Sequence, residues 1–162
     1  MTDQPDRPPT ITLAEPNIQL LGLADAQNQL KSDIQNSHVI YVWAYLIEAN
    51  FFSTLFAAHL SHARVYMIVD HRQRYVCAGL QDTFERFTAR SWSYNRTMHE
   101  KSFIFPELNT VWTGSHNLTR GSFTLSNNRS ARIESDQLTK ALADAWHRDW
   151  TLAKTIPRLK TL

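Results

Sequence analysis

A histidine and a lysine, His99 and Lys101, stand two positions apart, and Ser115 and Asn117 follow in the segment GSHN. On a strand, His99 and Lys101 share one face, because strand side chains alternate between faces. A lysine neutralises phosphate oxygens as a point charge, and an imidazole can attack phosphorus or move protons near neutral pH. Ser115 and Asn117 add a hydroxyl and a carboxamide as donors to an oxyanion. These residues predict chemistry on a phosphate ester.

The first half of the chain alternates strands with helices. Strands are predicted over residues 17–23, 38–47 and 63–69, from β-branched and aromatic runs with few polar breaks. Helices are predicted between and after them, the first with a stripe of Ala26, Leu30 and Ile34 and the others over residues 51–59 and 73–88. This alternation predicts right-handed crossovers and parallel strands covered by helices.

The second half changes to short strands, predicted over residues 91–97, 99–105, 110–113 and 128–133. Ser135 is a good N-cap for a closing helix, in which Leu138, Leu142, Trp146 and Trp150 form one apolar stripe that faces the core. The expected fold class is therefore α/β, with a mixed, mainly parallel central sheet and helices on both faces.

These motifs resemble the phospholipase D superfamily, and specifically its small single-motif bacterial endonuclease branch. The family pattern is His-x-Lys-x4-Asp, then Gly-Ser-x-Asn, then a closing helix that ends near Arg-x-Trp. The matching residues are His99, Lys101, Gly114, Ser115, Asn117, Arg148 and Trp150. A His-x-Lys pair alone is weak evidence, because the chain has seven histidines. The conjunction of both motifs in an α/β chain carries the resemblance, which covers residues 17–152.

The resemblance implies a phosphodiesterase that needs no metal and no cofactor. His99 would be the nucleophile that forms a phosphohistidine, with Lys101 and Asn117 binding the phosphate and Ser115 completing the site. One active site in that family uses two such motifs, whereas this chain holds one. The resemblance therefore implies a homodimer, in which the second His99 is the general acid and base. An endonuclease acting on DNA or RNA is the expected activity.

Two departures from the family pattern keep a second function open. The family's aspartate falls on Pro106, and the neighbouring Glu107 is its hypothesised replacement. The acidic residue that orients the histidine falls on Asn128, which cannot stabilise an imidazolium by charge. The alternative is a catalytically impaired nucleic-acid-binding module that keeps the phosphate pocket. A phospholipase is less favoured, because the sequence has no amphipathic membrane-docking stretch.

The net charge of +2 is unevenly distributed. Between residues 86 and 132 seven basic residues face two acidic ones, a local charge of +5 that leaves −3 for the remainder. This asymmetry indicates an anionic ligand held locally, although a solvated arginine-rich face explains the charge equally well. The candidate contacts to nucleic acid are Arg96, Arg120, Arg129 and Arg132.

The length of 162 residues allows one globular domain, expected over residues 17–162 after a flexible, proline-rich arm at residues 1–16. Cys77 is the single cysteine, which excludes an intrachain disulfide and cysteine-based zinc sites. No other spacing typical of a metal site is present, and the longest apolar run is too short to span a membrane. The start of the chain does not resemble a secretory signal, so a cytoplasmic location is expected.

Overall fold

The computed structural model describes residues 16–92 and 97–159, which form one eight-stranded sheet in the order β1-β7-β6-β5-β2-β3-β4-β8. Apart from Pro16, the predicted N-terminal arm lies outside the described residues, and so does Arg96. The strands are β1 (Asn17–Leu21), β2 (Val39–Ala44), β3 (Arg64–Asp70), β4 (Phe87–Trp92), β5 (Ser102–Phe105), β6 (Thr110–Gly114), β7 (Ser130–Glu134) and β8 (Lys154–Thr155).

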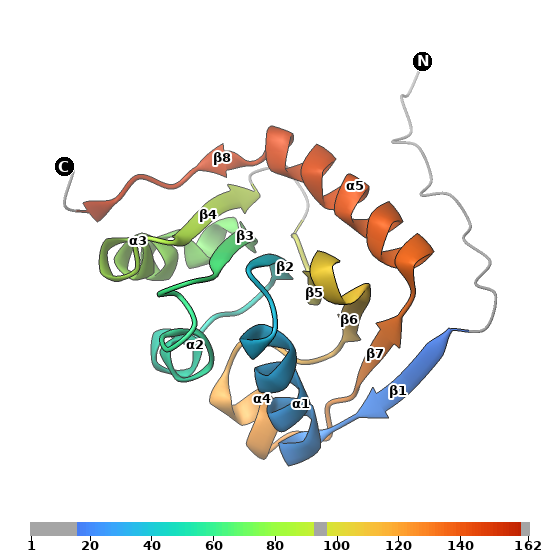
Figure 1. Cartoon of the computed structure of the whole chain (residues 1–162). Helices are drawn as coiled ribbons and strands as arrows, with labels where there is room; N and C mark the ends of the chain where they lie inside the picture. The colour runs from blue at the N-terminus through green and yellow to red at the C-terminus, as the bar shows by residue number, and fades with distance from the viewer. Residues whose placement is uncertain (1–15, 93–96, 160–162) are drawn as a thin grey trace.

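Helices cover both faces of this sheet (Figure 1). They are α1 (Leu23–Gln35), α2 (Ala49–Phe56), α3 (Arg74–Thr83), α4 (Arg120–Thr124) and α5 (Asp136–Leu152), with short 3-10 turns η1 (His71–Gln73) and η2 (Pro106–Leu108). Helix α5 lies alone on one face, and the other four helices lie on the opposite face. The predicted mixed sheet between helices is confirmed. Within the described ranges, no helix is long and apolar enough to cross a membrane.

The expectation of a mainly parallel sheet is wrong. Only the pairs β2 with β3 and β3 with β4 are parallel, and all other pairs in the described sheet are antiparallel. Helices α2 and α3 make the two crossovers that parallel neighbours require. Strand β1 does not join them, because it pairs with β7 at the far edge of the sheet. The later strands β5 and β6 are linked by the short turn η2, which produces an antiparallel pair.

Strand boundaries also differ from the sequence prediction around the candidate site. Helix α3 ends at Thr83 rather than residue 88, because Phe84 has extended backbone and a short turn then leads into β4 at Phe87. In β4 the side chains of Phe87, Ala89 and Ser91 are buried in alternation, which is the strand period. Strand β5 begins only at Ser102, so His99 and Lys101 lie in the segment that leads into it.

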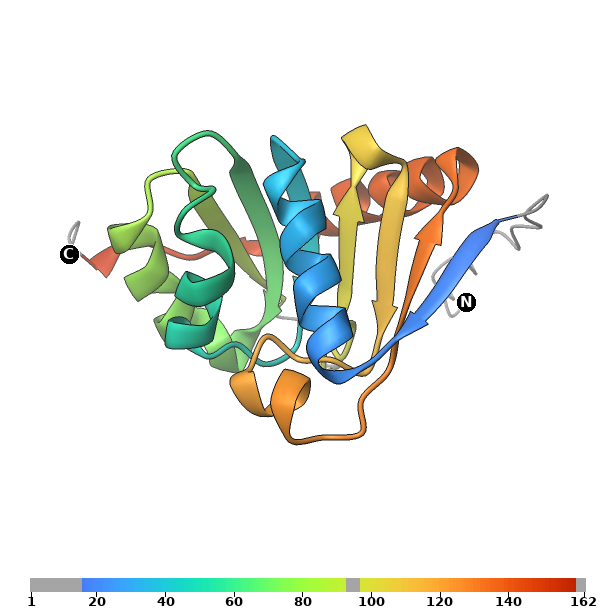
Figure 2. The same cartoon turned by 60° about the horizontal axis from the view of Figure 1, so that its bottom comes forward.

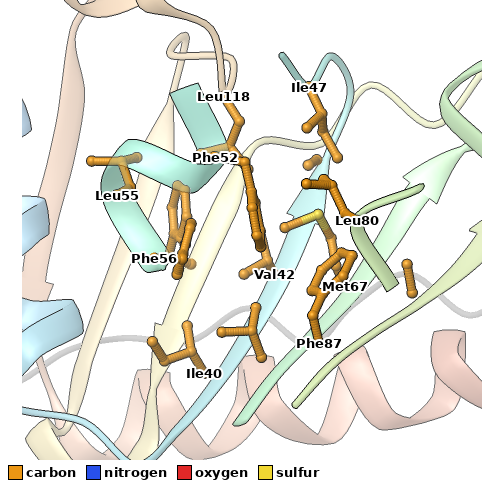
Figure 3. Close-up of a cluster of buried hydrophobic side chains, with 14 of the residues drawn as sticks. Ile40, Val42, Ile47, Phe52, Leu55, Phe56, Met67, Leu80, Phe87 and Leu118 are labelled. Atoms are coloured by element: carbon orange, nitrogen blue, oxygen red, sulfur yellow. The ribbon is translucent and has the colours of Figure 1, made fainter. Parts of the chain in front are cut away.

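Two apolar cores hold the layers together. The larger core lies between the sheet and α1 to α4, and Figure 3 shows part of it, with Phe52 and Phe56 of α2 packed over Val42 of β2. Burial of each such side chain contributes about 1.5–3 kcal/mol. On the other face, Trp146 of α5 is buried and its indole nitrogen donates to the Val42 carbonyl oxygen at 3.0 Å. The predicted stripe of α5 is therefore part of the core.

Candidate active site

The two sequence motifs meet at one edge of the sheet. Ser102 at the start of β5 is paired with Thr113 near the end of β6. His99 and Lys101 immediately precede the first of these strands, and the GSHN segment completes and follows the second. In Figure 2 this edge is the lower one, where the loops after β2 and β6 also lie.

His99 and Lys101 are in direct contact. The Lys101 Nζ lies 3.2 Å from His99 Nδ1 and donates to the His99 carbonyl oxygen at 2.9 Å. The spacing therefore brings ammonium and imidazole together, although neither residue is in the strand. Partial burial lowers the pKa of Lys101, and the nearby Glu100 charge opposes that effect. The lysine is thus a partly desolvated cation beside an exposed imidazole.

The ring of Tyr45, a residue that sequence reasoning missed, contacts both His99 and Lys101. Its ring centre lies 4.4 Å from that of His99 and 5.0 Å from Lys101 Nζ. The guanidinium carbon of Arg72 lies 5.2 Å from the same ring centre. Tyr45 follows β2 and Arg72 follows β3, two parallel neighbours. Polar residues just beyond the carboxyl ends of parallel strands are a usable signal for a site, and here that signal was present.

Arg72 is fixed by a buried aspartate. The Asp70 carboxylate accepts hydrogen bonds from the Arg72 backbone nitrogen at 3.1 Å and from its Nε at 2.7 Å. Burial raises the pKa of Asp70, but these hydrogen bonds outweigh it and hold the pKa below its ordinary value. The guanidinium also donates through Nη2 to the Tyr45 hydroxyl at 3.0 Å. Arg72 therefore stays charged in one orientation at the edge of the site.

The GSHN loop is anchored tightly to the start of β7. A Cβ on Gly114 would lie 2.4 Å from the Arg129 carbonyl oxygen, so only glycine fits there. The Ser115 hydroxyl accepts from the Arg129 backbone nitrogen at 3.0 Å and donates to its carbonyl oxygen at 3.2 Å. Ser115 thus holds the loop in place, and its hydroxyl is occupied by backbone rather than free for a ligand.

The loop that carries Asn117 runs beside the loop that carries Tyr45. Leu118 donates to the Leu46 carbonyl oxygen at 3.0 Å and accepts from the Glu48 backbone nitrogen at 2.9 Å. Asn117 Oδ1 is buried and has no hydrogen-bond partner among the described residues. This buried oxygen therefore lacks a donor next to the loop of Tyr45. The amide nitrogen Nδ2, rather than this oxygen, is the atom of Asn117 that can donate to an anion.

His116 is a second residue that sequence reasoning missed. It is 4% exposed, its ring stacks on Phe123 at 4.4 Å, and its Nδ1 lies 2.7 Å from Ser130 Oγ. Burial, assisted by the Arg129 charge, lowers the pKa of His116 to about 4. His116 is therefore a buried, neutral imidazole that links the GSHN loop to Ser130 at the start of β7.

One predicted supporting residue, Glu107, lies away from the site, whereas Asn128 lies beside the GSHN loop. Glu107 is in η2 at the opposite end of β5 from His99, where it accepts from the backbone nitrogens of His38 and Val39. The structure therefore does not bring Glu107 to the place of the family's aspartate. Asn128 donates through Nδ2 to the Ser122 carbonyl oxygen at 3.2 Å, which ties it to α4.

The four arginines predicted to contact nucleic acid differ in exposure. Arg132 is not a nucleic-acid contact, because it faces inward from β7 and pairs with Asp33 through Nε at 2.8 Å and Nη2 at 3.0 Å. Arg120 and Arg129 are exposed on the side of the GSHN loop, whereas Arg96 lies outside the described residues. No group of three or more metal-ligating side chains gathers in the described ranges.

Comparisons with known proteins agree with this arrangement. The profile of the family "Cardiolipin synthase, PLD-like domain" matches residues 30–150. Among solved structures, the phospholipase D family member Nuc from Salmonella typhimurium is 21% identical, with a TM-score of 0.75 over 88% of this chain and 99% of that one. NucT from Helicobacter pylori is 15% identical, with a TM-score of 0.72 over 87% and 99%.

A third similar structure is that of TrmBL2, an archaeal chromatin protein that shows a novel mode of DNA binding. It is 8% identical, with a TM-score of 0.62 over 86% of this chain and 54% of that one. Among curated proteins, no sequence matches the chain. The structural similarities show the fold, and the matched profile covers most of the sequence, including His99, Lys101 and Asn117. The chain therefore belongs to the family of phospholipase D-like domains.

Proposed function

We propose that the protein is a metal-independent endonuclease that cleaves DNA or RNA in a homodimeric active site. The observation that carries this proposal is the contact of His99 with Lys101 at the edge of the sheet where the loop after β6 carries Asn117. The proposed donors are nitrogen groups suited to phosphate oxygens. Resemblance to the nucleases Nuc and NucT supports nucleic acid as the substrate.

The proposed reaction has two displacements at phosphorus. A ring nitrogen of His99 attacks, the bond from phosphorus to the leaving oxygen breaks, and His99 of the partner subunit gives that oxygen a proton. The same partner histidine then takes a proton from water, whose oxygen attacks the phosphohistidine and breaks the bond to nitrogen. Lys101 and Asn117 bind the charged phosphate oxygens in both steps.

Activity without metal is tested with purified protein in EDTA, incubated with single- and double-stranded DNA and RNA. We expect cleavage by the parent and a loss of about a thousandfold or more in His99→Ala, since the nucleophile is removed. His62→Ala is the matched control, because His62 is exposed in the turn after α2. Equal cleavage by His99→Ala and the parent would contradict the proposal.

The shared site is tested by mixing subunits. If each active site needs His99 from both chains, an equal mixture of exchanged parent and His99→Ala subunits retains about a quarter of the parent activity. Independent monomeric sites would retain half. Light scattering that shows only monomers at micromolar concentration would also exclude the shared site.

The alternative, a nucleic-acid-binding module without catalysis, is favoured by one observation. No carboxylate from the described residues contacts the His99 ring, and Asn128 is bound to the backbone of Ser122. Binding of an oligonucleotide by both parent and His99→Ala, with cleavage by neither, would support that module. For either function we propose a cytoplasmic location, in which the buried Cys77 thiol stays reduced.

A further inference from the structure

Two cations rest on the Tyr45 ring, and the motif accounts for only one of them. Lys101 Nζ lies 5.0 Å and the guanidinium carbon of Arg72 lies 5.2 Å from the ring centre. The two charges are therefore no further apart than the sum of these distances. Successive phosphates on one strand of nucleic acid repeat about every 3.4 Å along the axis, so neighbouring phosphates can reach both cations.

Arg72 has the properties of a prepared anion-binding group. Its side chain is 50% exposed, while the Asp70 side chain that fixes it is 2% exposed. One N–H donates to Asp70 and one to the Tyr45 hydroxyl, and Nη1 makes no hydrogen bond to any described residue. A guanidinium held in this way loses little side-chain entropy when it binds an anion.

We infer that Arg72 binds the phosphate next to the one that is cleaved, and that Tyr45 sets the distance between this subsite and Lys101. This inference rests on the proposed function and narrows its substrate class. The preferred substrate carries at least two consecutive phosphates, as a polynucleotide does. A diester with a single phosphate leaves Arg72 without a ligand.

The test compares a dinucleoside monophosphate with the same compound carrying one added terminal phosphate, at the 5′ or at the 3′ end. The parent should hydrolyse one of the two phosphorylated forms with a kcat/KM about tenfold or more above that of the plain compound, since a charge-assisted hydrogen bond is gained. Arg72→Gln should remove most of this preference. Arg64→Gln, which removes the same charge at the other end of β3, should keep it.

A second variant tests the Tyr45 hydroxyl without removing the charge of Arg72. Tyr45→Phe keeps the ring under His99 and removes the hydroxyl that accepts from Arg72. We expect the preference to fall by about two- to fivefold, because the arginine remains but loses one hydrogen bond that orients it. Thermal melting monitored by circular dichroism shows whether each variant is folded.

The outcomes distinguish the inference from the proposed function. An equal loss by Arg72→Gln on all three compounds would mean that Arg72 acts through Tyr45 on His99, and would overturn the subsite. A parent without preference would overturn it too. If the parent cleaves nothing, the proposed nuclease fails, and the subsite is judged by binding of a single-stranded oligonucleotide. In that case Arg72→Gln must reduce the salt dependence, the slope of log K against log[salt], by about 0.7, and no reduction overturns the subsite.

Discussion

Two arginine and aspartate pairs in this protein have the same chemistry and different surroundings. In the pair of Asp70 and Arg72, the carboxylate is buried and the guanidinium is half exposed at the site edge. In the pair of Asp33 and Arg132, both side chains are buried, at 4% and 10% exposure, between α1 and β7. The first pair holds an exposed charge in place, where we infer that it binds phosphate, and the second cancels a charge inside the protein.

The difference comes from backbone position. Arg72 follows the end of β3, where the chain leaves the sheet and a long side chain can reach solvent. Arg132 is in the middle of β7 on the face that α1 covers, where Asp33 also accepts from the Trp112 indole nitrogen at 2.7 Å. An arginine in a basic segment is therefore a candidate for binding an anion only if its side chain points away from the covered face of the sheet and reaches solvent.

The largest expected effect separates the two pairs by stability. Arg132→Met leaves the buried Asp33 charge without its cation, which should lower the free energy of unfolding by about 3–5 kcal/mol. Arg72→Met should cost less, because the buried Asp70 carboxylate keeps the hydrogen bond from the backbone nitrogen of residue 72 and has His71 Nδ1 at 3.6 Å. Urea unfolding followed by tryptophan fluorescence measures both.

The control for this prediction is the double variant Asp33→Asn with Arg132→Met. Both charges are removed while the amide oxygen can still accept from the Trp112 indole nitrogen, so this variant should recover most of the loss, whereas Asp33→Leu leaves that nitrogen without an acceptor. If Arg72→Met proved as destabilising as Arg132→Met, the contrast between an oriented and a cancelled charge would be wrong.

Two histidines show the same contrast between an exposed and a buried side chain, and the buried one predicts that the free energy of unfolding depends on pH. His99 is exposed, whereas burial lowers the pKa of His116 from 6.5 to about 4. Below pH 6.5 the unfolded chain binds a proton that folded His116 does not bind. The stability due to neutral His116 is therefore complete above pH 6.5 and is lost progressively as the pH falls to about 4, by about 3 kcal/mol in total.

The measurement is urea unfolding at several pH values, for the parent and for His116→Gln. The difference between them isolates His116 from the carboxylates that titrate in the same range. The variant should lose less stability than the parent between pH 6.5 and 4. Parallel curves for the two proteins would show that the buried imidazole is not responsible.

Much of the fold could be predicted from the sequence, because apolar periodicity carries it. The buried strand over Val39–Ala44 and the stripe of α5 follow directly from residue type. Strand direction could not be predicted in the same way. That β1 pairs with β7 depends on a contact between residues more than a hundred positions apart, and no local pattern encodes it.

The candidate site was predictable where a motif is local in sequence. His99 and Lys101 are two residues apart and lie together. Tyr45 and Arg72 follow two other strands, β2 and β3, and only the order of β2, β3 and β5 in the sheet brings them near. The role of Ser115 was also hidden, because its hydrogen bonds to the Arg129 backbone depend on how β6 and β7 end.

The smallest expected effect concerns Glu107, at the other end of β5 from His99. Burial raises its pKa, but hydrogen bonds from the backbone nitrogens of His38 and Val39 outweigh this and lower the pKa. Its stabilisation is thus present above the ordinary pKa of 4.5 and lost as the pH falls through the lower folded value. Because the side chain is 42% exposed, Glu107→Gln should cost less than about 1 kcal/mol.

Hydrolysis by Glu107→Gln should stay within about twofold of the parent, whereas a group that orients a catalytic residue costs about 10- to 100-fold when removed. A loss of that size would place Glu107 in the active site after all and would contradict the separation of the two ends of the sheet.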